Sequence, residues 1–109
     1  MLATRFAPPP LAQLDRRGKR RLSRQSIQVD LEQHSYHSVD WSLAGFGLVG
    51  LHRAVAPGER LSAVVRDPSG SIAGDVLVEV IWTDGDRVGC RFLALSPRLR
   101  LGLQAFASL

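Results

Sequence analysis

The sequence is poor in cysteine and in long apolar runs, and each shortage removes a class of protein. Its 109 residues include one cysteine, Cys90, so no internal disulfide framework can form. No stretch is long and apolar enough to cross a bilayer, and residues 2–14 contain a triple proline where a signal peptide would have its apolar core. We therefore expect a cytoplasmic domain, standing alone or as the cytosolic part of a larger protein.

Acidic residues are nearly absent from the first 24 positions. This segment holds seven of the fourteen lysines and arginines but one of the ten acids, a net charge of +6, whereas residues 25–109 carry a net charge of −2. Because the excess of positive charge is confined to one segment, it favours a discrete anion site over a uniformly basic nucleic-acid surface. A disordered basic tail, or a linker to another domain, is the plainer alternative for such a run of charge.

Short alternating apolar stretches separated by turn residues predict an antiparallel all-β domain. The expected strands are residues 26–32, 36–42, 45–52, 61–66, 74–83 and 88–93, with the first turn at 33–35. After them the period changes. Ser96 is a suitable N-cap and Pro97 suits the first helical turn, which predicts a helix over 97–107. Gly102 weakens that helix by about 1 kcal/mol relative to alanine, so the helix must be stabilised by docking on the rest of the domain.

Two motifs supply groups that suit a guanine nucleotide. The arginine-rich run at residues 15–24 includes Arg20 and Arg24, whose forked guanidinium groups can meet guanine acceptors and phosphate. Further on, Asp40 can accept from the donor edge of the base. Ser42 lies on the same strand face as Asp40, and Gly45 permits a tight turn without a Cβ near the ligand.

Together these features resemble the PilZ domain family of bacterial receptors for cyclic di-GMP, a second messenger. That family is marked by an arginine–three residues–arginine motif in an N-terminal arm and by Asp/Asn-x-Ser-x-x-Gly in the barrel, and the second motif is met in full by Asp40, Ser42 and Gly45. The resemblance covers about residues 16–107. Its further features, in order, are residues 47–50, 57–61, 76–82, 89–92 and 96–97.

The resemblance implies a six-stranded, PilZ-type split β-barrel over residues 26–94 with a C-terminal helix over 97–107. A flexible basic arm, residues 16–25, would precede the barrel and fold over it, after a flexible proline-containing lead-in at residues 1–15. The implied output is a change of arm conformation that signals to a protein partner or a fused domain. Motility, exopolysaccharide synthesis and cell-cycle control are all compatible with the family.

The implied ligand is cyclic di-GMP, bound as one molecule or as two, with no other cofactor. Arg20 and Arg24 would contact guanine and phosphate, while Asp40 and Ser42 hold the other guanine edge beside Gly45. The register of the arginine motif stays open. Arg16/Arg20, Arg17/Arg21 and Arg20/Arg24 all have the required spacing. We favour Arg20/Arg24, although Arg17/Arg21 would lengthen a rather short gap to Asp40. Arg21 is an additional arm contact, and Arg16 and Arg17 are secondary candidates.

Catalysis is not expected. Ser42 has no evident activating base, the paired acids Asp84 and Asp86 fall in a solvated turn, and the spacing of His34 and His37 does not suit a metal. The alternatives to a receptor are a small barrel that binds nucleic acid and a PilZ-like domain that acts only through protein contacts. Nucleic-acid barrels need exposed aromatic residues interleaved with basic ones, so we expect no DNA or RNA partner.

Several apolar residues are predicted to be core. Trp41 alternates with the two polar site residues and should point inward, and Cys90 should be a small buried side chain. Trp82 is read as core or rim packing in preference to a base-stacking platform, on a strand whose faces the sequence does not assign. The remaining core candidates are Phe46, Phe92 and Phe106.

Overall fold

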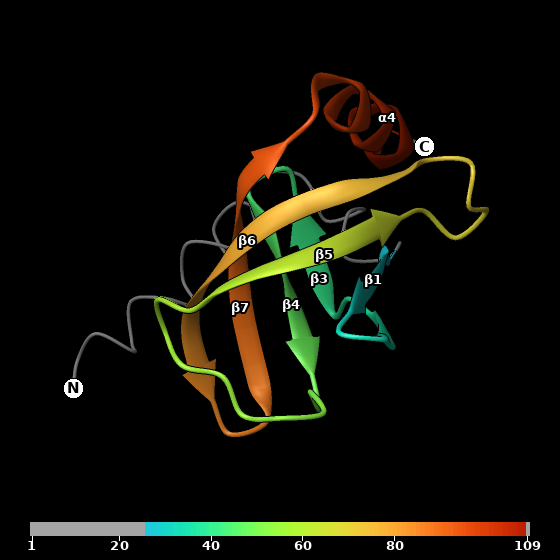
Figure 1. Ribbon diagram of the computed structural model, residues 1–109. Helices are drawn as coiled ribbons and strands as arrows, with labels where there is room; N and C mark the ends of the chain where they lie inside the picture. The colour runs from blue at the N-terminus through green and yellow to red at the C-terminus, as the bar shows by residue number, and fades with distance from the viewer. Residues whose placement is uncertain (1–25, 109) are drawn as a thin grey trace.

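One antiparallel sheet curls into a split barrel, and the C-terminal helix packs on one end of it (Figure 1). The computed structural model describes residues 26–108. Its elements are β1 (Gln28–Leu31), β2 (His34–His37), β3 (Asp40–Ser42), β4 (Gly45–Val49), β5 (Arg60–Arg66), β6 (Ala73–Asp84), β7 (Arg87–Leu95) and α4 (Pro97–Ala107). The strand order is β2-β1-β5-β6-β7-β4-β3. The predicted all-β fold with a C-terminal helix is confirmed.

The sheet has seven strands where the sequence predicted six, because the second predicted strand bends at Ser38 and Val39. On one side of this corner the Ser38 amide donates to the Ile27 carbonyl at 2.9 Å, and on the other the Val39 amide donates to the Gly47 carbonyl at 2.9 Å. The buried hydroxyl of Ser38 also accepts from the Ile27 amide at 3.0 Å. One continuous stretch of chain thus joins the two edges of the sheet, which limits the exposed edge.

The first turn is shorter than predicted. The sequence indicated residues 33–35, but Leu31 and His34 are already cross-strand partners, which leaves Glu32 and Gln33 as a two-residue turn. Both have positive φ, 51° and 70°. Two-residue hairpins need this geometry, and Asn-Gly or a similar pair normally supplies it. The prediction was wrong because the local sequence carries no such signal.

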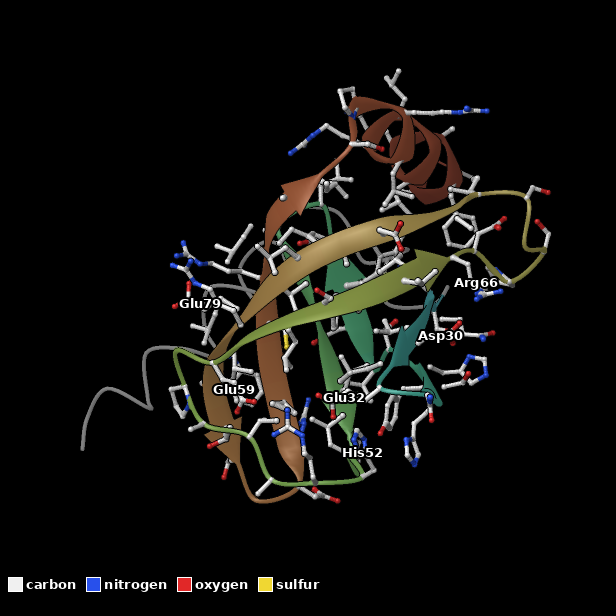
Figure 2. The ribbon with its side chains drawn as sticks, in the orientation of Figure 1. Asp30, Glu32, His52, Glu59, Arg66 and Glu79 are labelled. Atoms are coloured by element: carbon white, nitrogen blue, oxygen red, sulfur yellow. The ribbon has the colours of Figure 1, made fainter. Side chains whose placement is uncertain are left out.

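Distant side chains hold this turn. The Glu32 carboxylate accepts from Arg53 at 2.9 Å and from His52 Nε2 at 2.8 Å, and Arg53 also pairs with Glu59 at 2.7 Å. These bonds lower the pKa of Glu32 to about 2, with the Arg53 hydrogen bond the largest cause. Figure 2 shows Glu32, His52 and Glu59 near one another at the end of the barrel away from α4. This Glu32 clasp ties the β1–β2 turn to the long connection over residues 50–59.

The barrel interior contains most of the predicted core. Trp41 and Phe46 are each 1% exposed, Phe106 is 8% exposed, and Phe92 is half-buried against Phe46 with ring centroids 5.5 Å apart. Cys90 is 2% exposed, and burial raises the pKa of its thiol to about 12. The prediction that these side chains belong to the core is confirmed.

The helix begins where the sequence placed it. Ser96 accepts from the Leu99 amide at 3.1 Å as the N-cap, with Pro97 in the first turn. Gly102 has a packing reason, because a Cβ there would come within 2.8 Å of Ile72. The glycine that weakens the isolated helix therefore lets it approach the barrel closely, as docking requires.

The hydrogen bonds at the corner of residues 38–39 predict that loss of the Ser38 hydroxyl lowers the stability of the fold. Ser38→Ala leaves the Ile27 amide without its side-chain acceptor, and we expect the free energy of unfolding to fall by about 1–3 kcal/mol in urea titrations. Ser62→Ala, at an exposed β5 position, is the matched control and should change it by less than about 0.5 kcal/mol. Equal effects from the two variants would contradict this role for the corner.

Candidate functional site

The predicted site residues of the barrel share one hairpin. Asp40 and Ser42 lie on β3, and Gly45 begins β4, where it is the cross-strand partner of Ser42. Because Trp41 points into the core, its neighbours project from the opposite face of β3, where Asp40 is half-buried and Ser42 is buried. The predicted arm residues lie outside the described residues; they are Arg16, Arg17, Arg20, Arg21 and Arg24.

Pairing across four strands extends this outer face. Partner side chains in an antiparallel sheet project on the same side. Asp40 is the partner of Gly47, Gly47 of Gly89, and Gly89 of Trp82. One row therefore runs from a carboxylate, over two residues without side chains, to an indole. We call Gly47 and Gly89 the glycine floor.

The floor receives the Asp40 carboxylate at one end. A Cβ on Gly47 would lie 2.7 Å from Asp40 Oδ1, so the glycine makes room for that oxygen. Oδ1 is buried and accepts no hydrogen bond within the described part of the chain. Burial raises the pKa of Asp40, and the Arg87 charge and the Gly47 backbone lower it only in part. A buried carboxylate that is compensated only in part, with one oxygen unpaired, suits a ligand that brings N–H donors.

Trp82 lies over the other end of the floor because of a β-bulge. The register of β6 against β7 shifts between Val80, the partner of Cys90, and Trp82, the partner of Gly89. The extra residue, Ile81, turns Trp82 away from the core cluster that contains Val80. A Cβ on Gly89 would collide with the indole. Trp82 is 7% exposed, and its Nε1 donates no hydrogen bond within residues 26–108.

Two arginines flank this row on the same face. Arg87 and Arg91 lie on β7, two residues to either side of Gly89. Arg91 pairs with Glu79 of β6 at 2.9 Å, and Figure 2 shows Glu79 on the outside of that strand. Arg87 contributes positive potential at Asp40. The face therefore combines one buried carboxylate with cationic groups on both sides of the floor.

Ser42 and Gly45 have local structural roles that the motif alone does not show. The Ser42 hydroxyl accepts from the Ala44 amide at 3.1 Å, which stabilises the hairpin turn. A Cβ on Gly45 would collide with the backbone carbonyl of Cys90, so the glycine permits β4 to pair closely with β7. Both residues position the hairpin on which Asp40 lies.

Sequence reasoning missed three residues of this face. Gly47 and Gly89 were noted within longer matching stretches but were given no role, and Arg87 was not considered. Trp82 was predicted to be core or rim packing, and it is buried at 7% exposure. Only the bulge at Ile81 brings Trp82 to the outer face. Arg87, Gly89 and Arg91 alternate along β7 and so share its outer face. This alternation is visible in the sequence and could have indicated that arginines lie on both sides of Gly89.

The arrangement suits a planar ligand that carries N–H donors and negative charge. The Trp82 indole lies over Gly89 and the Asp40 carboxylate lies over Gly47, so the face offers an aromatic ring, an acceptor and, at Arg87, positive potential. Within residues 26–108, no cluster of three or more histidines, cysteines and acids is placed to hold a metal ion. None of the helical structure described is long and apolar enough to span a bilayer.

Comparisons with known proteins agree with the sequence resemblance. The family model described as PilZ domain matches residues 14–108. No curated protein matches the chain.

Two solved structures share the fold. An uncharacterized protein from Legionella is 17% identical with a TM-score of 0.61, and the match covers 75% of this chain and 86% of that one. The inhibitor of motility MotI/DgrA from Bacillus subtilis is 15% identical with a TM-score of 0.59, and the match covers 77% of this chain and 45% of that one. The matched region is thus less than half of the motility inhibitor.

The raised pKa of Asp40 predicts a pH-dependent effect of its removal. The folded protein holds the Asp40 proton more tightly than the unfolded chain does, so this group favours folding below its ordinary pKa of 3.8, and that benefit is lost as pH rises through the folded-state value. Asp40→Ala should therefore gain melting temperature relative to the wild type between pH 3 and pH 7, measured by circular dichroism. If the melting temperature of Asp40→Ala instead falls relative to that of the wild type between pH 3 and pH 7, the raised pKa of Asp40 is contradicted.

Proposed function

The chain belongs to the PilZ domain family, and on that premise we propose that it is a receptor for cyclic di-GMP and not an enzyme. The observation that carries the proposal is the buried, unpartnered Oδ1 of Asp40 above the glycine floor. Leaving such a group unsatisfied costs free energy, and a ligand that donates to it recovers that cost. The donor edge of guanine supplies adjacent N–H groups to a carboxylate.

In the proposed complex the barrel and the arm hold different parts of the ligand. Asp40 accepts from one guanine, and Ser42 and Gly45 keep the hairpin in place. Arg20 and Arg24 of the arm bind guanine acceptors and phosphate, with Arg21 as a further contact and Arg16 and Arg17 as secondary ones. One or two ligand molecules are compatible with this many cationic groups.

The proposed output is an order–disorder change in the arm. The arm residues would converge on the outer face only when an anion offsets their mutual repulsion, so ligand shifts the population toward the closed state. Equally slow amide exchange at residues 16–25 with and without ligand would contradict this.

The proposed recipient of the signal is a protein partner or a fused domain in the cytoplasm, and the fold shared with an inhibitor of motility is compatible with such a role. Charge supports a small ligand over nucleic acid, because the barrel and helix carry a net charge of −2 outside the basic segment.

Calorimetric titration tests the proposal directly. The full chain should bind cyclic di-GMP and not GMP at equal concentration. Asp40→Ala and Arg24→Ala should each weaken binding by about 1–3 kcal/mol, because each removes a direct contact to the base or phosphate. Absence of dinucleotide binding, together with binding of single-stranded RNA that survives Asp40→Ala, would favour the nucleic-acid alternative.

Alanine substitutions at Gly47 and Gly45 distinguish an effect on ligand binding from an effect on folding. Gly47→Ala places a methyl group where Asp40 Oδ1 lies, so cyclic di-GMP affinity should fall while the melting temperature changes little, since a side-chain end can move. Gly45→Ala meets backbone instead and should destabilise the fold by about 1–3 kcal/mol. Calorimetry and thermal melts on both variants would show this contrast, and equal affinity for Gly47→Ala and wild type would contradict the placement of the ligand at the floor.

A further inference from the structure

Two of the three buried polar atoms that lack a partner within the described residues lie on the same short row. They are Asp40 Oδ1 and Trp82 Nε1, and the third, Arg66 Nε, belongs to β5. The first lies where a Gly47 side chain would be and the second where a Gly89 side chain would be. Gly47 and Gly89 are direct cross-strand partners. An unsatisfied acceptor and an unsatisfied donor therefore stand over neighbouring strands, which are about 4.8 Å apart.

The indole N–H is buried and has no partner within residues 26–108, so it is the polar group of Trp82 that a ligand at this face would have to satisfy. One face of the ring is covered by the backbone of Gly89, since a Cβ there would collide with Nε1 and Cε2. Trp82 is 7% exposed and lies outside the core cluster. Buried tryptophan N–H groups usually find an acceptor. The Trp82 N–H is an unpaired donor, and Asp40 Oδ1 on the same row is an unpaired acceptor. A single ligand could satisfy both groups.

We propose that Trp82 determines base specificity in this site by donating its indole N–H to O6 of the guanine whose N–H donors Asp40 accepts. The inference rests on the proposed function, which it deepens. On the guanine edge the O6 acceptor is adjacent to the N–H donors, so a neighbouring donor and acceptor on the protein match it. The spacing of the two floor positions is that of adjacent strands, which is within reach of adjacent groups on one purine edge.

The same pair rejects adenine. Adenine carries an amino group where guanine carries O6, so the Trp82 donor would face a donor. Adenine also presents a ring acceptor toward Asp40, where guanine presents N–H. A site with fixed buried polar groups discriminates strongly against an analogue that leaves them unpaired. Trp82 therefore supplies selectivity against adenine, and Asp40 supplies most of the attraction for guanine.

Trp82→Phe tests the assignment, because it removes the N–H and keeps an aromatic ring over Gly89. Affinity for cyclic di-GMP should fall about 3- to 10-fold, the range expected for one hydrogen bond, and the preference over cyclic di-AMP should narrow by a similar factor. Leu103→Val, which trims a buried helix residue in the core, is the control for lost stability. It should lower the melting temperature without changing either affinity.

A measurement on the wild-type protein remains informative if Trp82→Phe does not fold. In a ¹⁵N-labelled sample the Trp82 indole signal is identified by its proximity to the Gly89 α-protons. On addition of cyclic di-GMP it should move downfield and exchange more slowly with solvent. Addition of cyclic di-AMP at the same concentration should leave it in place.

The outcomes distinguish the inference from the proposal beneath it. Cyclic di-GMP binding that Asp40→Ala weakens, while Trp82→Phe and the indole signal show no effect, overturns the role of Trp82 and leaves the receptor function intact. Absence of any cyclic di-GMP binding by the wild type overturns both. A weaker affinity in Trp82→Phe with unchanged selectivity over cyclic di-AMP also overturns the specificity assignment.

Discussion

Two backbone hydrogen bonds at the corner of residues 38–39 determine how the barrel closes and where the site lies. The Ser38 amide donates to Ile27, which precedes β1, and the Val39 amide donates to Gly47 of β4 on the other side of the sheet. The bond from Val39 to Gly47 also fixes the register of β3, which places Asp40 opposite Gly47 and Trp41 inward. A shift by one residue would exchange the carboxylate and the tryptophan between the two faces. Closure of the fold and presentation of the site thus depend on the same few atoms.

The outer face also illustrates a conflict between stability and binding. Burial of the Asp40 carboxylate, which Arg87 and the Gly47 backbone offset only in part, disfavours the folded state, as the raised pKa of the group indicates. A Cβ at Gly47 would displace the carboxylate, so the glycine preserves this unfavourable arrangement. Retained destabilising groups are typical of functional sites, where a ligand supplies the missing interaction.

Much of the fold was predictable from the sequence, because period and turn chemistry are local. Alternating residues indicated the strands, and Ser96 with Pro97 indicated the start of the helix. The exceptions have long-range causes. The turn at Glu32 depends on Arg53 and His52, and the division of the second strand depends on pairing with two different edges.

The candidate site was predictable only as a motif. Asp40, Ser42 and Gly45 could be selected from the chain, but local sequence does not show that Gly47 and Gly89 form a floor. The roles of the arm arginines stay predictions, since these residues lie outside the described part of the chain.

The bulge at Ile81 has a consequence for reading this strand in related sequences. One added residue changes the pairing parity after it, so Val80 is the partner of the inward Cys90 whereas Trp82 is the partner of Gly89 on the outer face, although both side chains are buried. An alignment that runs through the strand without a gap would equate an outward tryptophan with an inward aliphatic residue in a relative that lacks the insertion. Presence or absence of that single residue, more than the identity of its neighbours, would then sort relatives into those that can place an indole on the outer face of the sheet and those that cannot.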